Sequence, residues 1–448
     1  MKQTSQRTKR KYNDACINYA VQGRAKTKGK LWMQAAILVI CGAMVLTSCS
    51  SEDNPADDPT AEEPTLPEAR VTEAIRYDEA KMTAYNIEYP STDPYGQPVT
   101  LSGTITVGDE VTKGEPARGM LLYNHYTVNR ADECPSQGEL AVQKLVVGSG
   151  LITVSADYYG FGVTGDKPQA YCVPSAYAQA SVDALIAART LLAQMGYTWD
   201  DKLFSAGYSQ GGQTTIGVLR LVTEKHPDIR FTRSFAGGGP YCIPEIYRQF
   251  MASNQTAMPS TVVGVLYSYN DVFGLGLSRE DIFREPLLSH LDEWLLSKQY
   301  KQAEIEALIG SQTVTDFIVP TLMDPDAEPS RRLMEAMQRE DLCQGWTPRQ
   351  DEQLTIVHNV SDGAVPVANA ERIVEFLREK GLPITHDYTE PGVYARLEDF
   401  GEISGIAPAH ELGALFFFVH VIVETSENLG IEPWNTPDFN TLQEFLSH

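Results

Sequence analysis

The segment Gly207-Tyr208-Ser209-Gln210-Gly211 constrains this chain more than any other sequence feature. It follows an apolar run at 203–206 that predicts a strand, and it precedes a segment to about Lys225 that predicts a helix. Glycines on both sides of a serine permit a strained strand-to-helix turn that lifts the hydroxyl clear of a sheet. The pattern therefore predicts Ser209 as a nucleophile, and the backbone N–H of Gln210 as a donor to an oxyanion.

The rest of the chain alternates between strand and helix patterns, which predicts an α/β fold with a mostly parallel sheet and crossover helices. Continuous apolar runs at 119–124 and 151–156 are typical of strands that are covered on both faces. Other strands are predicted at 81–89, 99–107, 231–236, 354–358 and 384–389, and helices at 175–195, 211–225 and 412–423. Between about 241 and 350 the alternation lapses into helical segments, which predicts a helical cap inserted late in the sheet.

Two later residues are predicted to activate Ser209. Asp362 lies in a loop directly after a predicted strand, where a carboxylate can reach the same end of the sheet, although an ordinary Asp-Gly turn would look the same. The histidines that follow it are His386, His410, His420 and His448. Only His410 occupies a junction between a loop and a helix, so we expect it to be the base and Asp362 to orient it.

Aromatic residues gather in two loops that are expected to flank the nucleophile. Tyr126 follows the predicted strand at 119–124, in the position of a second oxyanion donor. Tyr158, Tyr159 and Phe161 follow the next strand and are predicted to line a substrate site, because aromatic walls suit short or medium acyl and aromatic esters. The alternative is that these rings pack the loops onto the sheet.

The motif with its following glycine, Gly207 to Gly212, and the segment Ala156-Asp157-Tyr158-Tyr159-Gly160-Phe161-Gly162 carry a family likeness. Together they resemble the secretory-lipase and related esterase branch of the α/β-hydrolase superfamily, over about residues 82–425. The resemblance implies hydrolysis of carboxylic esters through an acyl-enzyme, with Ser209, Asp362 and His410 as the triad and no cofactor. Tyr126 departs from this branch, which usually has glycine at that position.

Other functions stay open at this point. A peptidase of the same fold would use the same triad, but it would need an acidic anchor for a substrate amine. A non-catalytic surface binding protein is the remaining alternative. The segment 160–165 fits a dinucleotide-binding pattern, yet Asp166-Lys167-Pro168 follows instead of a helix. His410-Glu411 has Ala414 where a zinc motif needs its second histidine, so no metal is predicted.

The N-terminus predicts export and lipid attachment. A basic segment leads into an apolar run of 16 residues, Leu31 to Leu46, which ends Leu46-Thr47-Ser48-Cys49 and resembles a bacterial lipobox. We therefore expect a signal peptide at 1–48, lipidation of Cys49, an acidic Pro-rich tether at 49–68 and a catalytic domain at 69–448. This predicts an exported lipoprotein of the bacterial cell envelope, at the outer membrane, although an uncleaved membrane anchor would also fit.

Charge and cysteine content limit the partners further. Residues 1–48 hold nine Lys or Arg and one acid, so the remaining chain has 27 basic and 58 acidic residues and a net charge of −31. Such a surface excludes nucleic acid as a partner and is compatible with a small-molecule acyl ester. Export permits disulfides, and the loop positions of Cys134 and Cys172 favour that pair, with buried free thiols as the alternative.

Overall fold

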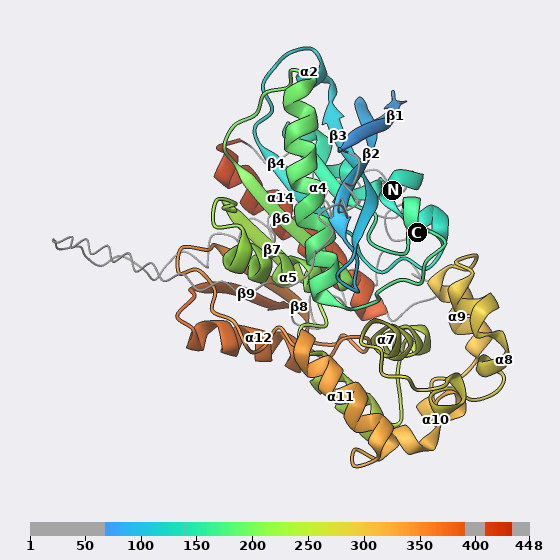
Figure 1. Ribbon diagram of the computed structural model, residues 1–448. Coiled ribbons are helices and arrows are strands. Elements are labelled where there is room, and N and C mark those ends of the chain that lie inside the picture. Colours follow the sequence, from blue (N-terminus) through green and yellow to red (C-terminus); the bar gives the residue numbers. More distant parts are fainter. Residues whose placement is uncertain (1–67, 139, 390–407, 432–448) are drawn as a thin grey trace, which may run out of the picture. The chain divides into compact units, whose positions relative to one another are not determined.

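The computed structural model describes residues 68–138, 140–389 and 408–431 (Figure 1). The predicted signal peptide, the predicted lipidation site Cys49 and all but the last residue of the predicted tether lie outside these residues. Within the described part, no helix combines the length and the apolar character that crossing a membrane requires.

A mixed sheet of nine strands forms the centre of the described chain, in the order β1-β2-β3-β5-β4-β6-β7-β8-β9. The strands are β1 Arg70–Tyr77, β2 Met82–Thr92, β3 Pro98–Gly108, β4 Met120–Asn124, β5 Ile152–Ala156, β6 Leu203–Tyr208, β7 Arg233–Gly237, β8 Leu354–Asn359 and β9 Ile384–Thr389. Strands β1, β2, β3 and β5 pair antiparallel, and all pairings from β5 through β4 to β9 are parallel. The mostly parallel sheet confirms the predicted fold class.

Side chains of the central strands alternate between two apolar layers, because successive residues of a strand point to opposite faces. In β4, Met120 and Leu122 belong to one buried cluster, whereas Leu121 and Tyr123 belong to the other. Helices α4, α5 and α12 contribute to the first cluster, and α3 and α14 to the second. The bounds of these helices, and of the short helix α2, are α2 Asp109–Thr112, α3 Ala141–Val146, α4 Pro174–Gln194, α5 Gln210–Lys225, α12 Val367–Glu379 and α14 Pro408–Leu429 (Figure 1).

Strand β1 was not expected from the sequence. Its residues are exposed or half-buried, and the alternation of its half-buried residues Val71, Ile75 and Tyr77 is broken at Glu73, where the pairing register also shifts. The antiparallel pairing with β2, helped by an ion pair of 2.7 Å between Arg70 and Glu88, places it at the edge of the sheet.

The segment between β7 and β8 is helical and has an apolar core of its own, which includes Leu266, Leu291 and Phe317. Its helices are α6 Ile243–Ser253, α7 Pro259–Val272, α8 Leu287–Leu291, α9 Gln302–Ile309, α10 Val314–Phe317 and α11 Glu328–Glu340. Figure 1 shows α7 to α11 gathered at one end of the sheet. The carboxylate of Glu340 accepts hydrogen bonds from the backbone N–H and the hydroxyl of Ser175, both at 2.9 Å, and so joins α11 to the start of α4.

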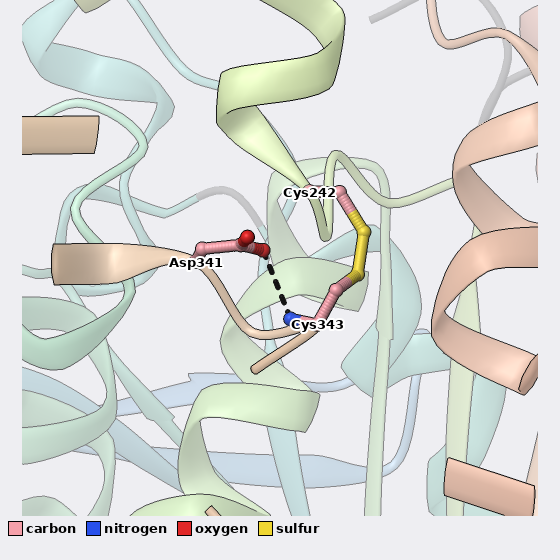
Figure 2. Close-up of side chains that lie close together, drawn as sticks. All are labelled: Cys242, Asp341 and Cys343. Carbon is pink, nitrogen blue, oxygen red and sulfur yellow. Dashed lines mark hydrogen bonds between the residues drawn. A yellow bond between two sulfur atoms is a disulfide. The ribbon is translucent and has the colours of Figure 1, made fainter. Parts of the chain in front are cut away.

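The favoured pairing of Cys134 with Cys172 is wrong. Cys242 forms a disulfide with Cys343, and their Cα atoms lie 5.7 Å apart (Figure 2). Cys134 and Cys172 are free and buried in different apolar clusters, Cys134 beside Phe161 and Cys172 within the core of the helical insertion. The observed bond joins the two ends of the insertion, and Asp341 accepts a hydrogen bond from the backbone N–H of Cys343 at 2.9 Å (Figure 2).

Candidate active site

Ser209 occupies a strained turn between β6 and α5. Its backbone has φ 57° and ψ −124°, a conformation that costs a residue with a side chain about 1–3 kcal/mol. The backbone N–H of Ser209 donates to the carbonyl of Gly237 at 2.8 Å and holds the turn against β7. A Cβ atom on Gly211 would lie 2.1 Å from the carbonyl oxygen of Asn124, so only glycine fits there. The turn leaves the Ser209 side chain half-buried at the end of β6.

The structure brings together the three residues that the sequence predicts as a triad. Asp362 lies in the loop after β8, and His410 lies in the first turn of α14. The His410 Nε2 atom is 2.9 Å from the Ser209 hydroxyl oxygen, and the His410 Nδ1 atom is 2.5 Å from Asp362 Oδ2. This is a continuous chain of hydrogen bonds from hydroxyl to imidazole to carboxylate, the arrangement in which an imidazole can take a serine proton.

The carboxylate of Asp362 is fixed on both oxygens. Its Oδ1 accepts hydrogen bonds from the backbone N–H groups of Ala364 and Val365, both at 2.9 Å, while its Oδ2 accepts a hydrogen bond from His410 Nδ1. Burial acts to raise the pKa of Asp362, but the charge of His410 and its hydrogen bond outweigh this, so the pKa lies below its ordinary value. The side chain is therefore ionised at neutral pH and can stabilise an imidazolium.

His358 is a neighbour of this site to which the sequence analysis assigned no role. Its Nε2 atom lies 2.8 Å from the carbonyl oxygen of Val365 and 3.8 Å from Asp362 Oδ2. Burial lowers the pKa of His358, so the ring is neutral and donates from Nε2 to Val365. Its position at the end of β8, four residues before Asp362, is the only sequence signal, because a histidine in an apolar strand is also an ordinary core residue.

A cavity of about 480 Å³ opens beside Ser209 and His410. Its walls come mainly from the apolar faces of α6 and α7, together with the loops after β4 and β7. Gln210 and Tyr126, the two predicted sources of oxyanion donors, also line it. The lining residues are Tyr126, Thr127, Glu133, Tyr171, Cys172, Tyr208, Ser209, Gln210, Pro240, Ile243, Ile246, Tyr247, Phe250, Met251, Met258, Thr261, Val262, Val265, Leu266, Lys301, Gln302, Ala303, Ala364, Val365, His410 and Ala414.

The three aromatic residues predicted to bind substrate are absent from these cavity walls. Tyr158 stacks between His125 and Tyr177, with ring centroids 4.1 and 4.5 Å away. Tyr159 is buried, and its ring packs edge-on against the ring of Tyr95 in the loop between β2 and β3. Phe161 packs in a small buried cluster beside Cys134. For these three residues of the loop after β5, the geometry corresponds to the packing alternative, because their rings contact other buried side chains, whereas Tyr126 of the loop after β4 lines the cavity.

The sheet order, the strained serine turn after a central strand and the helical insertion before β8 define the α/β-hydrolase fold. No protein-family model matches the chain, and no curated protein matches it by sequence. Among solved structures, it is similar to a rice cell wall degrading esterase, LipA from Xanthomonas oryzae, with 18% identity and a TM-score of 0.66, covering 81% of this chain and 98% of that one. It is also similar to Candida antarctica lipase A, with 15% identity and a TM-score of 0.61, covering 85% of this chain and 89% of that one.

Proposed function

We propose that this protein is a serine-dependent hydrolase of carboxylic esters that works through an acyl-enzyme. The observation that carries the proposal is the chain of hydrogen bonds from Ser209 through His410 to Asp362, 2.9 and 2.5 Å long, at the wall of an apolar cavity. The esterase and the lipase with similar folds support the same class of reaction.

The reaction follows from the roles that these groups can take. His410 Nε2 accepts the proton of Ser209 as its oxygen attacks the acyl carbonyl, and Asp362 stabilises the imidazolium. Backbone N–H groups of Gln210 and Tyr126 donate to the oxyanion. The imidazolium then protonates the leaving alcohol, a water molecule deprotonated by His410 attacks the acyl-enzyme, and His410 returns that proton to the Ser209 oxygen as the carboxylic acid leaves. None of these steps needs a cofactor.

The composition of the cavity favours an acyl ester over a peptide with a free amine. Glu133 is the only acidic residue among those that line the described cavity. Its Oε2 atom already accepts from the backbone N–H groups of Asn129 and Arg130, at 3.2 and 2.9 Å. The other walls are mostly apolar, and apolar walls recognise a hydrocarbon chain by burying it.

Ester preference and acyl fit can be tested together. We expect neutral acyl esters to be cleaved with kcat/KM well above that of aminoacyl amides of similar size. Val265→Trp, at a half-buried position on α7, narrows the cavity and should lower kcat/KM for an octanoyl ester far more than for an acetyl ester. Steady-state kinetics with both esters measures this.

The control variant is Val163→Trp, an equal change at an exposed position outside the cavity walls, which should leave the ratio of the two esters unchanged. Faster cleavage of the amides would favour the peptidase. If Val265→Trp leaves the ratio of kcat/KM between the octanoyl and acetyl esters unchanged, the cavity does not bind the acyl chain. A fluorophosphonate probe that fails to label Ser209 would favour the non-catalytic binding protein.

We also propose that the mature chain is anchored in the bacterial cell envelope through lipid on Cys49, on the basis of Leu46-Thr47-Ser48-Cys49. Cys49→Ala should move the protein from the membrane fraction to the soluble fraction, because the attached acyl chains supply the membrane affinity. Cell fractionation with mass spectrometry of the N-terminal peptide measures this. Cys41→Ala, inside the apolar run, serves as the control and should remain in the membrane fraction. An unmodified Cys49 in the membrane fraction would contradict the proposal.

A further inference from the structure

We propose that Tyr208 is a positioning residue that keeps His410 within hydrogen-bonding distance of the Ser209 hydroxyl. The inference rests on the proposed function, and it assigns a task to the residue directly before the nucleophile. Tyr208 contributes its backbone to β6, while its side chain reaches across to the first turn of α14.

The central contact is a hydrogen bond from a side chain to the backbone. The Tyr208 hydroxyl donates to the carbonyl oxygen of His410 over 2.6 Å, and the residue as a whole is 3% exposed. A carbonyl oxygen has two lone pairs, so it can accept this bond in addition to one within the helix. The Tyr208 ring also lies against the His410 imidazole, with centroids 5.1 Å apart and planes inclined by 47°. Tyr208 therefore contacts both the backbone and the ring of His410.

The residues around Tyr208 form a narrow slot that fits its side chain closely. A Cβ atom on Gly413 would lie 2.3 Å from the Tyr208 hydroxyl oxygen, and a Cβ atom on Gly238 would lie 2.6 Å from Cζ. Phe417 closes the slot with a ring centroid 5.6 Å from that of Tyr208. The hydroxyl can stay beside the His410 carbonyl because the residue one turn along α14 has no side chain.

The position of His410 matters because its Nε2 atom must stay 2.9 Å from the Ser209 hydroxyl. Ser209 and His410 come from different elements, β6 with its turn and α14, so their separation is set by contacts between those elements. Tyr208 is covalently bonded to Ser209 and hydrogen-bonded to His410, so it links the two directly. A misplacement of about 1 Å between reacting groups can lower a rate by about 100-fold.

The variant Tyr208→Phe tests the proposal because it keeps the ring and removes the hydroxyl. We expect kcat for a short acyl ester to fall by about tenfold with KM within about twofold of the wild type, the pattern of a lost transition-state interaction. The rate of Ser209 labelling by a small fluorophosphonate should fall by a similar factor, because that reaction needs the serine and the base but not the acyl cavity.

Tyr89→Phe is the matched control. Tyr89 is buried like Tyr208, and its hydroxyl likewise donates to a backbone carbonyl, that of Ala180 on α4, at 3.0 Å, but Tyr89 is absent from the cavity walls. This variant should lose a similar amount of thermal stability and keep the wild-type kcat and labelling rate. An equal loss of kcat in both variants would reduce Tyr208 to a general stabilising residue and overturn the proposal.

A second variant approaches the same bond from α14. Gly413→Ala places a methyl group where the Tyr208 hydroxyl lies, so it should also lower kcat. In the double variant with Tyr208→Phe, the nearest remaining ring atom, Cζ, is 3.3 Å from that methyl group, a contact that a small shift relieves. The double variant should therefore be no slower than Tyr208→Phe alone. A rate equal to the product of the two separate losses would show that the two changes act independently and would overturn the proposal.

The remaining outcomes separate this inference from the proposed function. A raised KM with normal kcat in Tyr208→Phe would mean that the hydroxyl contacts the substrate, and a wild-type rate in every assay would mean that it does nothing for the reaction. Either result overturns the positioning role while the esterase stands. A wild-type protein that neither cleaves esters nor reacts with the probe would overturn both.

Discussion

Ser209→Ala is expected to lower kcat for ester hydrolysis by about 10⁴- to 10⁶-fold, as removal of a triad nucleophile does in serine hydrolases. The cavity and any oxyanion donors would remain, so ester binding should change little. His410→Ala should cause a comparable loss, and the double variant should be no slower than either single one, because in the proposed mechanism the two residues act as a unit. Single-turnover kinetics and fluorophosphonate labelling measure both effects.

Two control variants test whether the loss of activity is specific to Ser209 and His410. Ser181→Ala, at a buried serine on α4, should retain full activity. His420→Ala should reduce stability and leave the chemistry intact, because His420 lies 2.8 Å from Asp387 and 3.4 Å from Glu424 and is absent from the cavity walls. Burial acts to lower the pKa of His420, but hydrogen bonds to these two carboxylates outweigh it and raise the pKa to about 9. Near-normal turnover in Ser209→Ala would end the proposed mechanism.

Loss of the disulfide between Cys242 and Cys343 is expected to lower the free energy of unfolding by about 2–5 kcal/mol. The bond closes a loop with a sequence separation of 101 residues, so in the unfolded chain it removes a large amount of conformational freedom. Cys242 directly precedes α6, whose residues line the cavity, so ester hydrolysis should become more sensitive to temperature as well. Denaturant titration of the double variant Cys242→Ser with Cys343→Ser measures the stability change.

Reduction of the wild-type protein provides the internal check. Dithiothreitol should lower the melting temperature of the wild type and of Cys134→Ser, whose sulfur is a buried free thiol. It should have no further effect on the double variant, because that chain has no bond left to reduce between the ends of the insertion. An unchanged melting temperature in the reduced wild type would contradict the stabilising role of this bond.

The sequence alone was sufficient for features that depend on neighbours along the chain. The turn at Ser209 needs glycines at 207 and 211 and a strand and a helix on either side, and all of these lie within about 25 residues. The strands β4 and β5 could be recognised from continuous apolar runs, since both faces of such strands are buried. Chain order together with loop position selected Asp362 and His410, and the structure places His410 beside Ser209 and Asp362 beside His410.

Tertiary structure decided the contacts between residues that are far apart in sequence. Cys242 and Cys343 meet because the helical insertion returns to its own base, and cysteine spacing does not encode that path. Whether Tyr158 faced a substrate or the core depended on loop conformation, and the edge strand β1 depended on its pairing with β2. The hydrogen bond from Tyr208 to His410 spans 202 positions and needs the space left by Gly413. No local sequence pattern therefore indicates that these two residues are in contact. Local patterns determine strands, helices and turns through short-range sterics, whereas packing selects among long-range contacts that local sequence leaves open.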